Sequence, residues 1–289
     1  MKKHMDKILA LSLLLVPYVS IAAPHDFCPG SQCKQVWGMN DAYHATYSYD
    51  DHGTSSWLSC DPSRDVDYRN GTLTINYSHL QGAKENTCYI KFDLFTQHPE
   101  LREHGFLTAT ITVTSNQQVQ GRIWPAFWLV GPAPWPTNGE IDIAEYMPNP
   151  NFRTDVNLNG GPHTNQNHTE PAVASYPGRG LSDLGLTHVY SMEWILQGKL
   201  TDPKHTYLLK FYLDNQYVGQ KMLEGDPRFT DTDQAVVRGM DENAMRIVFD
   251  TNDIIANRPN NSDPAPVKNA PDLSYQLKAT DVKAYVIGP

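Results

Sequence analysis

Positive charge is scarce in this sequence. Lysine and arginine together number 23, against 32 aspartate and glutamate residues, which gives a formal net charge of −9 at pH 7. A surface with this balance repels phosphate backbones and sulfated polymers, because like charges oppose association. We therefore expect no nucleic-acid partner, and a neutral substrate fits the chain better than a polyanion does.

Long apolar runs are also scarce, and the one that exists lies at the beginning of the chain. The basic start MKKHMDK is followed by the apolar stretch ILALSLLLVPYVSI, which Pro17 interrupts, and the small residues Ser20 and Ala22 stand at its end. This order is typical of a secretory signal peptide, whereas a membrane span needs about 20 apolar residues. We predict a signal peptide over residues 1–22 and a secreted protein, extracellular or periplasmic, that leaves the membrane after cleavage. The alternative is a membrane anchor.

Cysteine is limited to four residues: Cys28, Cys33, Cys60 and Cys88. An exported chain meets an oxidising environment, so we expect two disulfide bonds. Three pairings are available, and the local one joins Cys28 to Cys33 and Cys60 to Cys88. The alternative is a zinc site, which the spacings do not favour because they fit no common ligand pattern.

A helical period is absent from every window of 12 or more residues. Short runs rich in β-branched and aromatic residues, bounded by Gly, Pro, Asn and Asp, recur instead and predict strands. They cover residues 72–77, 88–95, 106–114, 122–130, 140–147, 188–196, 206–214, 215–223, 244–250 and 281–288. Many strands without intervening helices predict an all-β sandwich or barrel. We expect a hairpin turn at Asp214–Asn215 and long polar loops over residues 148–186 and 256–272.

Three acidic residues stand close together in the segment GEIDIAEYM, residues 139–147: Glu140, Asp142 and Glu145. Alternate residues of a strand share one face, so Glu140 and Asp142 point the same way and Glu145 points the other way. One extra residue within the run IAE, a β-bulge, returns Glu145 to the face of the other two. Ile141 and Ile143 then face the core, and we expect the acids to line a cleft open to water on the concave face of a sheet.

The spacing of these acids suits the hydrolysis of a glycosidic bond. With one residue taken up by the bulge, the backbones of Glu140 and Glu145 lie about 13 Å apart, and side chains that lean together bring the carboxyl groups to roughly 5–6 Å. Retaining glycosidases hold their two carboxyl groups about 5–5.5 Å apart. We expect Asp142, between them, to help raise at least one pKa, as a general acid requires. The alternatives are a solvated acidic strand and a calcium site, although no Asn- and Asp-rich loop accompanies the acids.

The segment GEIDIAEY resembles the signature of the family 16 glycoside hydrolases in its bulged form, E-x-D-x-x-E, which is that of laminarinase-type and galactanase-type members. Residues 105–131 (GFLTATITVTSNQQVQGRIWPAFWLVG) and 134–146 (PWPTNGEIDIAEY) are similar to the same family. With weaker similarities at 187–194, 211–218 and 282–285, the resemblance extends over most of residues 105–285. It implies a two-sheet antiparallel jelly-roll sandwich, concanavalin-like, with a concave substrate cleft. The chain then divides into a signal peptide (1–22), an N-terminal segment (23–40) and a catalytic domain (41–289).

The resemblance implies that Glu140 is the nucleophile, that Asp142 assists it, and that Glu145 is the general acid and base of a retaining double displacement. The activity it implies is endo-hydrolysis of a β-1,3-glucan such as laminarin, by a monomer with a polysaccharide as its partner and no required cofactor or metal, a structural calcium ion being an option. The alternatives are a galactanase of the agarase or carrageenase kind, a mixed-linkage β-glucanase, and a non-catalytic glucan-binding module. The late strand MRIVFDTNDII departs from the family's usual NLAIGG run, so it leaves the exact sugar specificity open.

Four further residues are candidates for substrate binding. Trp135 matches the tryptophan just before the family's catalytic strand, which contacts sugar, and His163 in NGGPH matches a histidine that faces the substrate. Trp124 and Trp128 match the family's WPAFW segment. Alternation along a strand places these two on one face, where they line either the cleft or the core.

Overall fold

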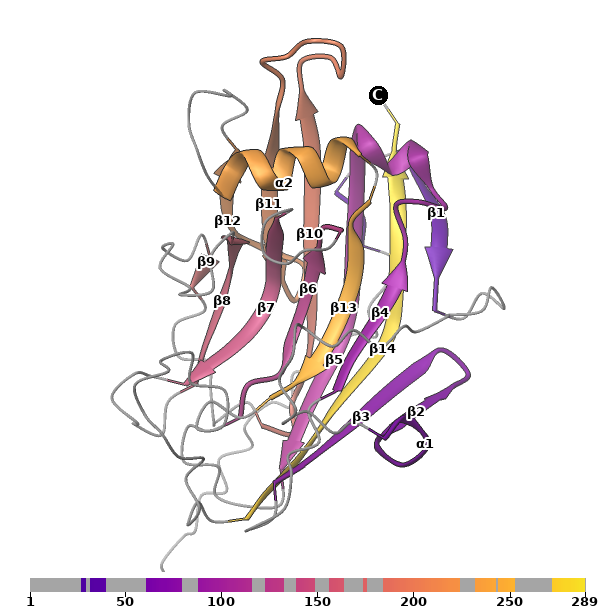
Figure 1. The fold of residues 1–289 in the computed structure, drawn as a ribbon, viewed down its shortest axis with the longest axis vertical. Coiled ribbons are helices and arrows are strands. Elements are labelled where there is room, and N and C mark those ends of the chain that lie inside the picture. The colour runs from indigo at the N-terminus through magenta and orange to yellow at the C-terminus, as the bar shows by residue number, and fades with distance from the viewer. Residues whose placement is uncertain are drawn as a thin grey trace, which may run out of the picture.

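A computed structural model describes residues 27–29, 32–39, 61–79, 88–115, 123–132, 139–148, 156–163, 174–175, 184–223, 232–242, 244–252 and 272–288. The described chain folds into two antiparallel sheets (Figure 1). One sheet, here called sheet A, contains β1 (Cys33–Gly38), β2 (Val66–Arg69), β3 (Thr72–His79), β5 (His104–Ser115), β10 (Thr187–Gln197), β11 (Thr206–Leu213), β12 (Gln216–Met222) and β14 (Leu273–Ile287). Its strand order is β12-β11-β10-β5-β14-β3-β2, and β1 also pairs with β14.

The second sheet, sheet B, contains β4 (Cys88–Asp93), β6 (Ala126–Val130), β7 (Glu140–Pro148), β8 (Val156–His163), β9 (Ala174–Ser175) and β13 (Arg246–Thr251). Its strand order is β4-β13-β6-β7-β8-β9, so strands far apart in the sequence lie side by side. The helical segments are short: α1 (Pro62–Asp65), the 3₁₀ helix η1 (Pro99–Arg102) and α2 (Thr232–Asp241). This arrangement confirms the predicted two-sheet antiparallel sandwich.

The hydrophobic core lies between the two sheets, and it follows from alternation along the strands. In β5, Leu107, Ala109, Ile111 and Val113 are buried in the core, while Thr108 and Thr112 alternate with them. Sheet B contributes residues such as Phe127, Leu129, Ile141 and Ile143 to the same cluster. Each large apolar side chain that is fully buried contributes about 1.5–3 kcal/mol, so this layer accounts for much of the cohesion between the sheets.

Two hairpins of sheet A turn on residues with positive φ. Asp214 and Asn215 have φ values of 50° and 65° and join β11 to β12, which confirms the turn predicted there. Asn70 and Gly71 have φ values of 50° and 70° and join β2 to β3. Two consecutive residues with positive φ define the type I′ turn, whose twist matches that of the paired strands.

Part of the predicted loop over residues 148–186 is wrong, because β8 and β9 lie within it. The β8 sequence, VNLNGGPH, is rich in Asn, Gly and Pro, which have low strand propensity. Pairing with β7 along its length overrides this local preference. The other predicted loop, residues 256–272, lies outside the described residues apart from Asp272.

Helix α2 was not anticipated, because its ten residues are shorter than the window over which a helical period is recognised. Its residues Val236, Val237 and Met240 are buried in the main hydrophobic core. In Figure 1 the helix crosses in front of the strands near one end of the sandwich. Lys221 Nζ of β12 lies 3.1 Å from Asp233 Oδ1 at the beginning of α2 and so ties that end to sheet A.

The opposite end of α2 is tied to sheet A through Asp241. Its carboxylate lies 2.8 Å and 2.9 Å from His205 Nε2 and accepts a 3.0 Å hydrogen bond from the Tyr207 hydroxyl. The Asp202 carbonyl lies 2.5 Å from His205 Nδ1. Burial lowers the pKa of His205, but the Asp202 carbonyl and the Asp241 carboxylate outweigh it, so the pKa is raised overall.

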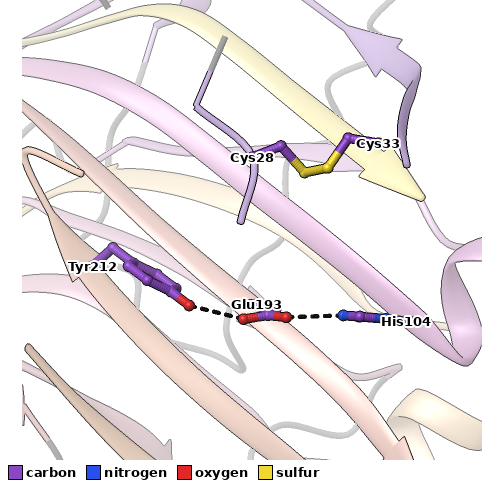
Figure 2. The surroundings of a disulfide bond; sticks show 5 residues. All are labelled: Cys28, Cys33, His104, Glu193 and Tyr212. Carbon is purple, nitrogen blue, oxygen red and sulfur yellow. Dashed lines mark hydrogen bonds and ion pairs between the residues drawn. A yellow bond between two sulfur atoms is a disulfide. The ribbon is translucent and has the colours of Figure 1, made fainter. Parts of the chain in front are cut away.

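The N-terminal segment is part of sheet A, since β1 pairs with β14 from Cys33 to Gly38. A disulfide joins Cys28 to Cys33, as predicted for this pair (Figure 2). Cys88 is also disulfide-bonded, and its predicted partner, Cys60, lies outside the described residues. No helix in the described part of the chain is long and apolar enough to cross a membrane.

The disulfide packs on the outer face of sheet A, above an aromatic cluster that includes Phe106 and Tyr212. Beside it, Glu193 is buried and accepts a 2.8 Å hydrogen bond from the Tyr212 hydroxyl, and His104 Nε2 lies 2.8 Å away (Figure 2). Lys210 Nζ also donates to Glu193, at 3.1 Å. Burial raises the pKa of Glu193, but His104, Tyr212 and Lys210 lower it more strongly in sum. This polar cluster lies on the face of sheet A opposite the core.

Candidate active site

The three acids predicted as a catalytic group lie together on β7, an interior strand of sheet B. On the β6 side, Asp142 pairs with Trp128 and Ala144 pairs with Phe127, so Ile143 has no partner between them. The register against β8 also shifts between Asp142 and Glu145. The predicted bulge within the run IAE is therefore present.

The bulge returns Glu145 to the face that carries Glu140 and Asp142. The pairs across β6 are Glu140 with Val130, Asp142 with Trp128, and Glu145 with Ala126. These three β6 residues are alternate residues of one strand, so they share a face and their partners share it too. We call this face of sheet B the acid face.

The acid face points away from the core between the sheets. Ile141, Ile143 and Ala144 of β7 are buried in that core, as predicted for the two isoleucines. Ala126, Trp128 and Val130 instead form a small separate apolar cluster with Val248. The bulge thus divides β7 into apolar residues on one side and carboxylates on the other.

The three acids are more buried than the sequence suggested. We expected a row open to water, but Glu140, Asp142 and Glu145 are only 3%, 3% and 2% exposed, so the expected exposure is wrong. Buried carboxylates are costly unless hydrogen-bonded donors or nearby charges compensate them. Their neighbours on the acid face are therefore important for the chemistry.

Trp124 is one such neighbour. Its indole Nε1 donates a 2.8 Å hydrogen bond to Glu145 Oε1. Its main-chain N–H donates a 2.9 Å hydrogen bond to the carbonyl of Asn252, and the Tyr275 hydroxyl bonds both the N–H and the carbonyl of Asn252, at 2.5 Å and 2.6 Å. Tyr275 belongs to β14, so a strand of sheet A fixes the position of a donor to Glu145.

Trp128 is the second neighbour. Its indole Nε1 donates a 2.8 Å hydrogen bond to Asp250 Oδ2 on β13. Trp128 belongs neither to the core between the sheets nor to an exposed surface, since it is 4% exposed within the small cluster on the acid face. The sequence left open whether Trp124 and Trp128 line the cleft or the core. Neither belongs to the main core between the sheets.

Asp250 is a residue of this face that the sequence analysis did not identify. It stands in the run RIVFDT of β13, where it reads as the polar residue at the end of an apolar strand. Burial raises its pKa well above the usual range, Trp128 lowers it in part, and the Asp142 carboxylate raises it further. Only the pairing of β13 with β6, more than 100 residues away in sequence, brings it to the acids.

The remaining predicted binding residues are placed only in part. His163 stands directly opposite Glu140 in the register of β7 and β8, which puts its backbone beside the first acid. Trp135 lies outside the described residues. Within the described ranges, no group of three or more His, Cys, Asp or Glu side chains is arranged to hold a metal ion.

Comparison with known proteins points to the same region. Residues 108–179 match the family described as XgeA-like, catalytic GH16 domain. The matched stretch is about a quarter of the chain and contains β6, β7, β8 and β9 together with all three acids. No curated protein matches the chain.

Solved structures share the fold over almost the whole chain. An endo-1,3-beta-glucanase from Streptomyces sioyaensis is 16% identical with a TM-score of 0.59, covering 92% of this chain and 100% of its own. The laminarinase from Rhodothermus marinus is 18% identical with a TM-score of 0.55, covering 89% and 99%. A third structure comes from work on endo-acting O-glycanases with which human gut microbes initiate mucin breakdown. It is 16% identical with a TM-score of 0.50, covering 93% and 97%.

These likenesses establish the architecture: the chain is a two-sheet antiparallel jelly-roll sandwich. At identities of 16–18% they establish the fold alone. The same fold serves enzymes named for different glycans, so the substrate has to be argued from the site.

Proposed function

We propose that this chain is a secreted family 16 glycoside hydrolase that cleaves β-1,3-glucan chains internally, with retention of configuration. The observation that carries the proposal is the bulge in β7, which gathers Glu140, Asp142 and Glu145 on one face of sheet B. A strand without a bulge would direct Glu145 into the core. The matched family segment contains this motif, which supports the assignment.

In the proposed reaction, Glu145 protonates the leaving glycosidic oxygen while Glu140 attacks the anomeric carbon. The glycosidic bond breaks, and a covalent glycosyl ester forms on Glu140. Glu145, now a carboxylate, then takes a proton from water, and the water oxygen displaces Glu140 from the anomeric carbon. Two inversions give net retention.

The neighbours of the acids support this division of roles. Trp124 donates to Oε1 of Glu145, which fixes the orientation of the carboxyl group that has to deliver and later accept a proton. Asp142, between the two glutamates on the same face, is proposed to assist Glu140 by hydrogen bonding and by its charge. No metal or cofactor is required in this scheme, although a structural calcium ion is compatible with it.

The proposed substrate is a neutral glucan, and two features support it. The net charge of −9 disfavours sulfated polymers such as carrageenan. Similar solved structures include an endo-1,3-beta-glucanase and a laminarinase. Trp135 and His163 are proposed to contact the sugar, and the enzyme is proposed to act as a secreted monomer.

Substrate class is tested by a reducing-sugar assay on laminarin, lichenan, agarose, carrageenan and a mucin glycoprotein. We expect turnover on laminarin to exceed that on every other polymer, with oligosaccharides of several lengths appearing early. Faster cleavage of lichenan would identify a mixed-linkage glucanase, and faster cleavage of agarose would identify a galactanase. Binding to laminarin with no product from any polymer would identify a binding module.

The roles of the two glutamates are tested by azide rescue. Glu140→Ala removes the nucleophile, so azide should enter from the vacated face and give a glycosyl azide of inverted configuration. Glu145→Ala keeps the nucleophile, so an activated aryl glycoside should still react, and azide should give a product of retained configuration. The opposite stereochemistry in the two variants would refute the assignment.

A further inference from the structure

A fourth carboxyl group lies on the acid face, two strands away from the three acids. In the register of sheet B, Asp250 of β13 stands opposite Ala126 of β6, and Ala126 stands opposite Glu145 of β7. Asp250 is 6% exposed. The mechanism proposed above gives it no role, yet an acid buried this deeply needs a reason.

We propose that Asp250 is a positioning residue that remains a neutral carboxylic acid and fixes the Trp128 indole beside Asp142. The proposal rests on the function proposed above, because it concerns the surroundings of that reaction. It assigns to Asp250 no contact with the reacting atoms. Its effect passes through Trp128, the residue that pairs directly with Asp142 across β6 and β7.

The contacts of Asp250 are those of a hydrogen-bond acceptor for sheet B. Trp128 Nε1 donates to Oδ2 at 2.8 Å, and the main-chain N–H of Ala126 donates to the same carboxyl group. Both donors belong to β6, the strand that lies between β13 and β7. The carboxyl group therefore holds the strand and the indole that separate it from the acids.

Carboxylates and one buried cation share the acid face with Asp250, and among them the Asp142 carboxylate favours its neutral form. On β7 the acid face carries Glu140, Asp142 and Glu145, and on β6 it carries no titratable group among the residues described. On β4 it carries Tyr89, opposite Asp250, and the buried Lys91, opposite Val248. Arg246, on β13 itself, lies 2.6 Å from Asp93 at the far end of the strand.

Burial has the largest effect on the pKa of Asp250. It raises the pKa of Asp250 well above the usual range, the two donors from β6 lower it in part, and the Asp142 carboxylate raises it again. If Asp250 were ionised, it would add a further negative charge beside Asp142. A neutral acid instead keeps an acceptor for Trp128 without adding that charge.

Two variants separate the acceptor from the charge. Asp250→Asn keeps an oxygen acceptor for Trp128 Nε1 and cannot ionise, whereas Asp250→Ala removes the acceptor. Trp128→Phe removes the indole, and Asp93→Asn is the matched control, since it changes another carboxylate of the same sheet that lies 2.6 Å from Arg246. All variants are made in the full-length secreted protein.

The first measurement is tryptophan fluorescence as a function of pH. The measurement is made in the Trp124→Phe background, because Trp124 donates to Glu145, whose protonation also alters fluorescence. In that background we expect a transition whose midpoint lies well above 3.9, roughly the pKa of an ordinary aspartate, and we expect Asp250→Asn and Trp128→Phe to abolish it. A transition that survives the added Asp250→Asn change, or the absence of one above the ordinary range in the background protein, would overturn the neutral acid.

The second measurement is thermal stability as a function of pH. Because the folded-state pKa is raised, the stability linked to this proton is complete below the unfolded-state pKa and is lost as the pH rises towards the folded-state pKa. Asp250→Asn escapes this loss. We expect its Tm to exceed that of the wild-type protein by about 2 °C or more at pH 8 and the difference to shrink towards pH 4. A gap that does not grow with pH, or that Asp93→Asn reproduces, would overturn the proposal.

The third measurement is turnover of laminarin at neutral pH. We expect Asp250→Asn to stay within about threefold of the wild-type kcat and Asp250→Ala to lose roughly 10- to 100-fold, with a smaller change in KM, since misplaced groups cost rate in this range. Wild-type kcat in Asp250→Ala would refute the positioning role. If the wild-type protein cleaves none of the glycans, the proposed function fails, while the fluorescence and stability measurements still decide whether Asp250 is neutral and bound to Trp128.

Discussion

Replacing Gly139 by alanine should damage both the stability and the activity of this protein. Gly139 directly precedes Glu140, and its φ of +87° lies in the left-handed region. A Cβ atom at this position would lie 2.7 Å from both Cα and N of Val236, in the middle of α2. Since main-chain atoms of a helix cannot rotate away as a side chain can, either α2 or the beginning of β7 has to move.

The magnitude follows from two contributions. The left-handed conformation costs a residue with a Cβ atom about 1–2 kcal/mol, and forcing apart packed elements costs about 1–3 kcal/mol more. We therefore expect Gly139→Ala to lower the free energy of unfolding by about 2–5 kcal/mol. Because the displacement begins one residue before Glu140, kcat on laminarin should also fall roughly 10- to 100-fold.

Gly185→Ala provides the matched control. Gly185 has a φ of +83°, but apart from its chain neighbours no atom of the described residues lies within 4 Å of the position that its Cβ would occupy. This variant therefore carries the backbone strain without the collision, and we expect a loss of only about 1–2 kcal/mol with unchanged kcat. Urea denaturation and initial rates on both variants separate the two contributions. Equal losses of stability in the two variants would refute the close packing of α2 on the start of β7.

Three further predictions concern other contacts. Trp124→Phe removes the donor to Glu145 and should lower kcat on laminarin by roughly 10-fold or more, since a hydrogen bond to a charged group contributes about 1.5–3 kcal/mol. An unchanged kcat would show that this hydrogen bond does not contribute to catalysis. Because the folded-state pKa of His205 is raised, stability should be greatest below the unfolded-state value of about 6.5 and should decline as the pH rises through the folded-state value. In Asp241→Asn the Tm should vary less between pH 6 and pH 9, and an unchanged dependence would contradict this linkage. Cys33→Ser opens the disulfide of the N-terminal segment and should cost about 2 kcal/mol of stability without changing kcat, because this disulfide lies on the outer face of sheet A; an equal loss of kcat would argue against that separation.

The features that the sequence predicted well are those that depend on short, continuous segments of the chain. The alternation in residues 106–114 corresponds to β5, and the spacing of the three acids predicted a bulge, because only an extra residue brings Glu145 to the face of Glu140. The turn at Asp214–Asn215 followed from residue types that tolerate positive φ. Each of these inferences needs only neighbours along the chain.

The features that were missed depend on contacts between distant segments. Strand β8 contains too many Asn and Gly residues to be recognised by itself and exists through its pairing with β7. The burial of the acids involves contacts with residues of other segments, such as that of Trp124 with Glu145, which alternation does not report. Asp250 reads as an ordinary strand residue until the register with Ala126 places it on the acid face.

The contact between Tyr275 and Asn252 has an evolutionary consequence. One hydroxyl group on sheet A holds both main-chain polar atoms of a residue that anchors Trp124, the donor to Glu145. A change at Tyr275, a position of β14 inside the core between the sheets, therefore affects the residue that acts as the acid in our proposal. Among related sequences, Tyr275 and Trp124 should consequently covary, as though they belonged to one inherited unit spanning both layers of the sandwich.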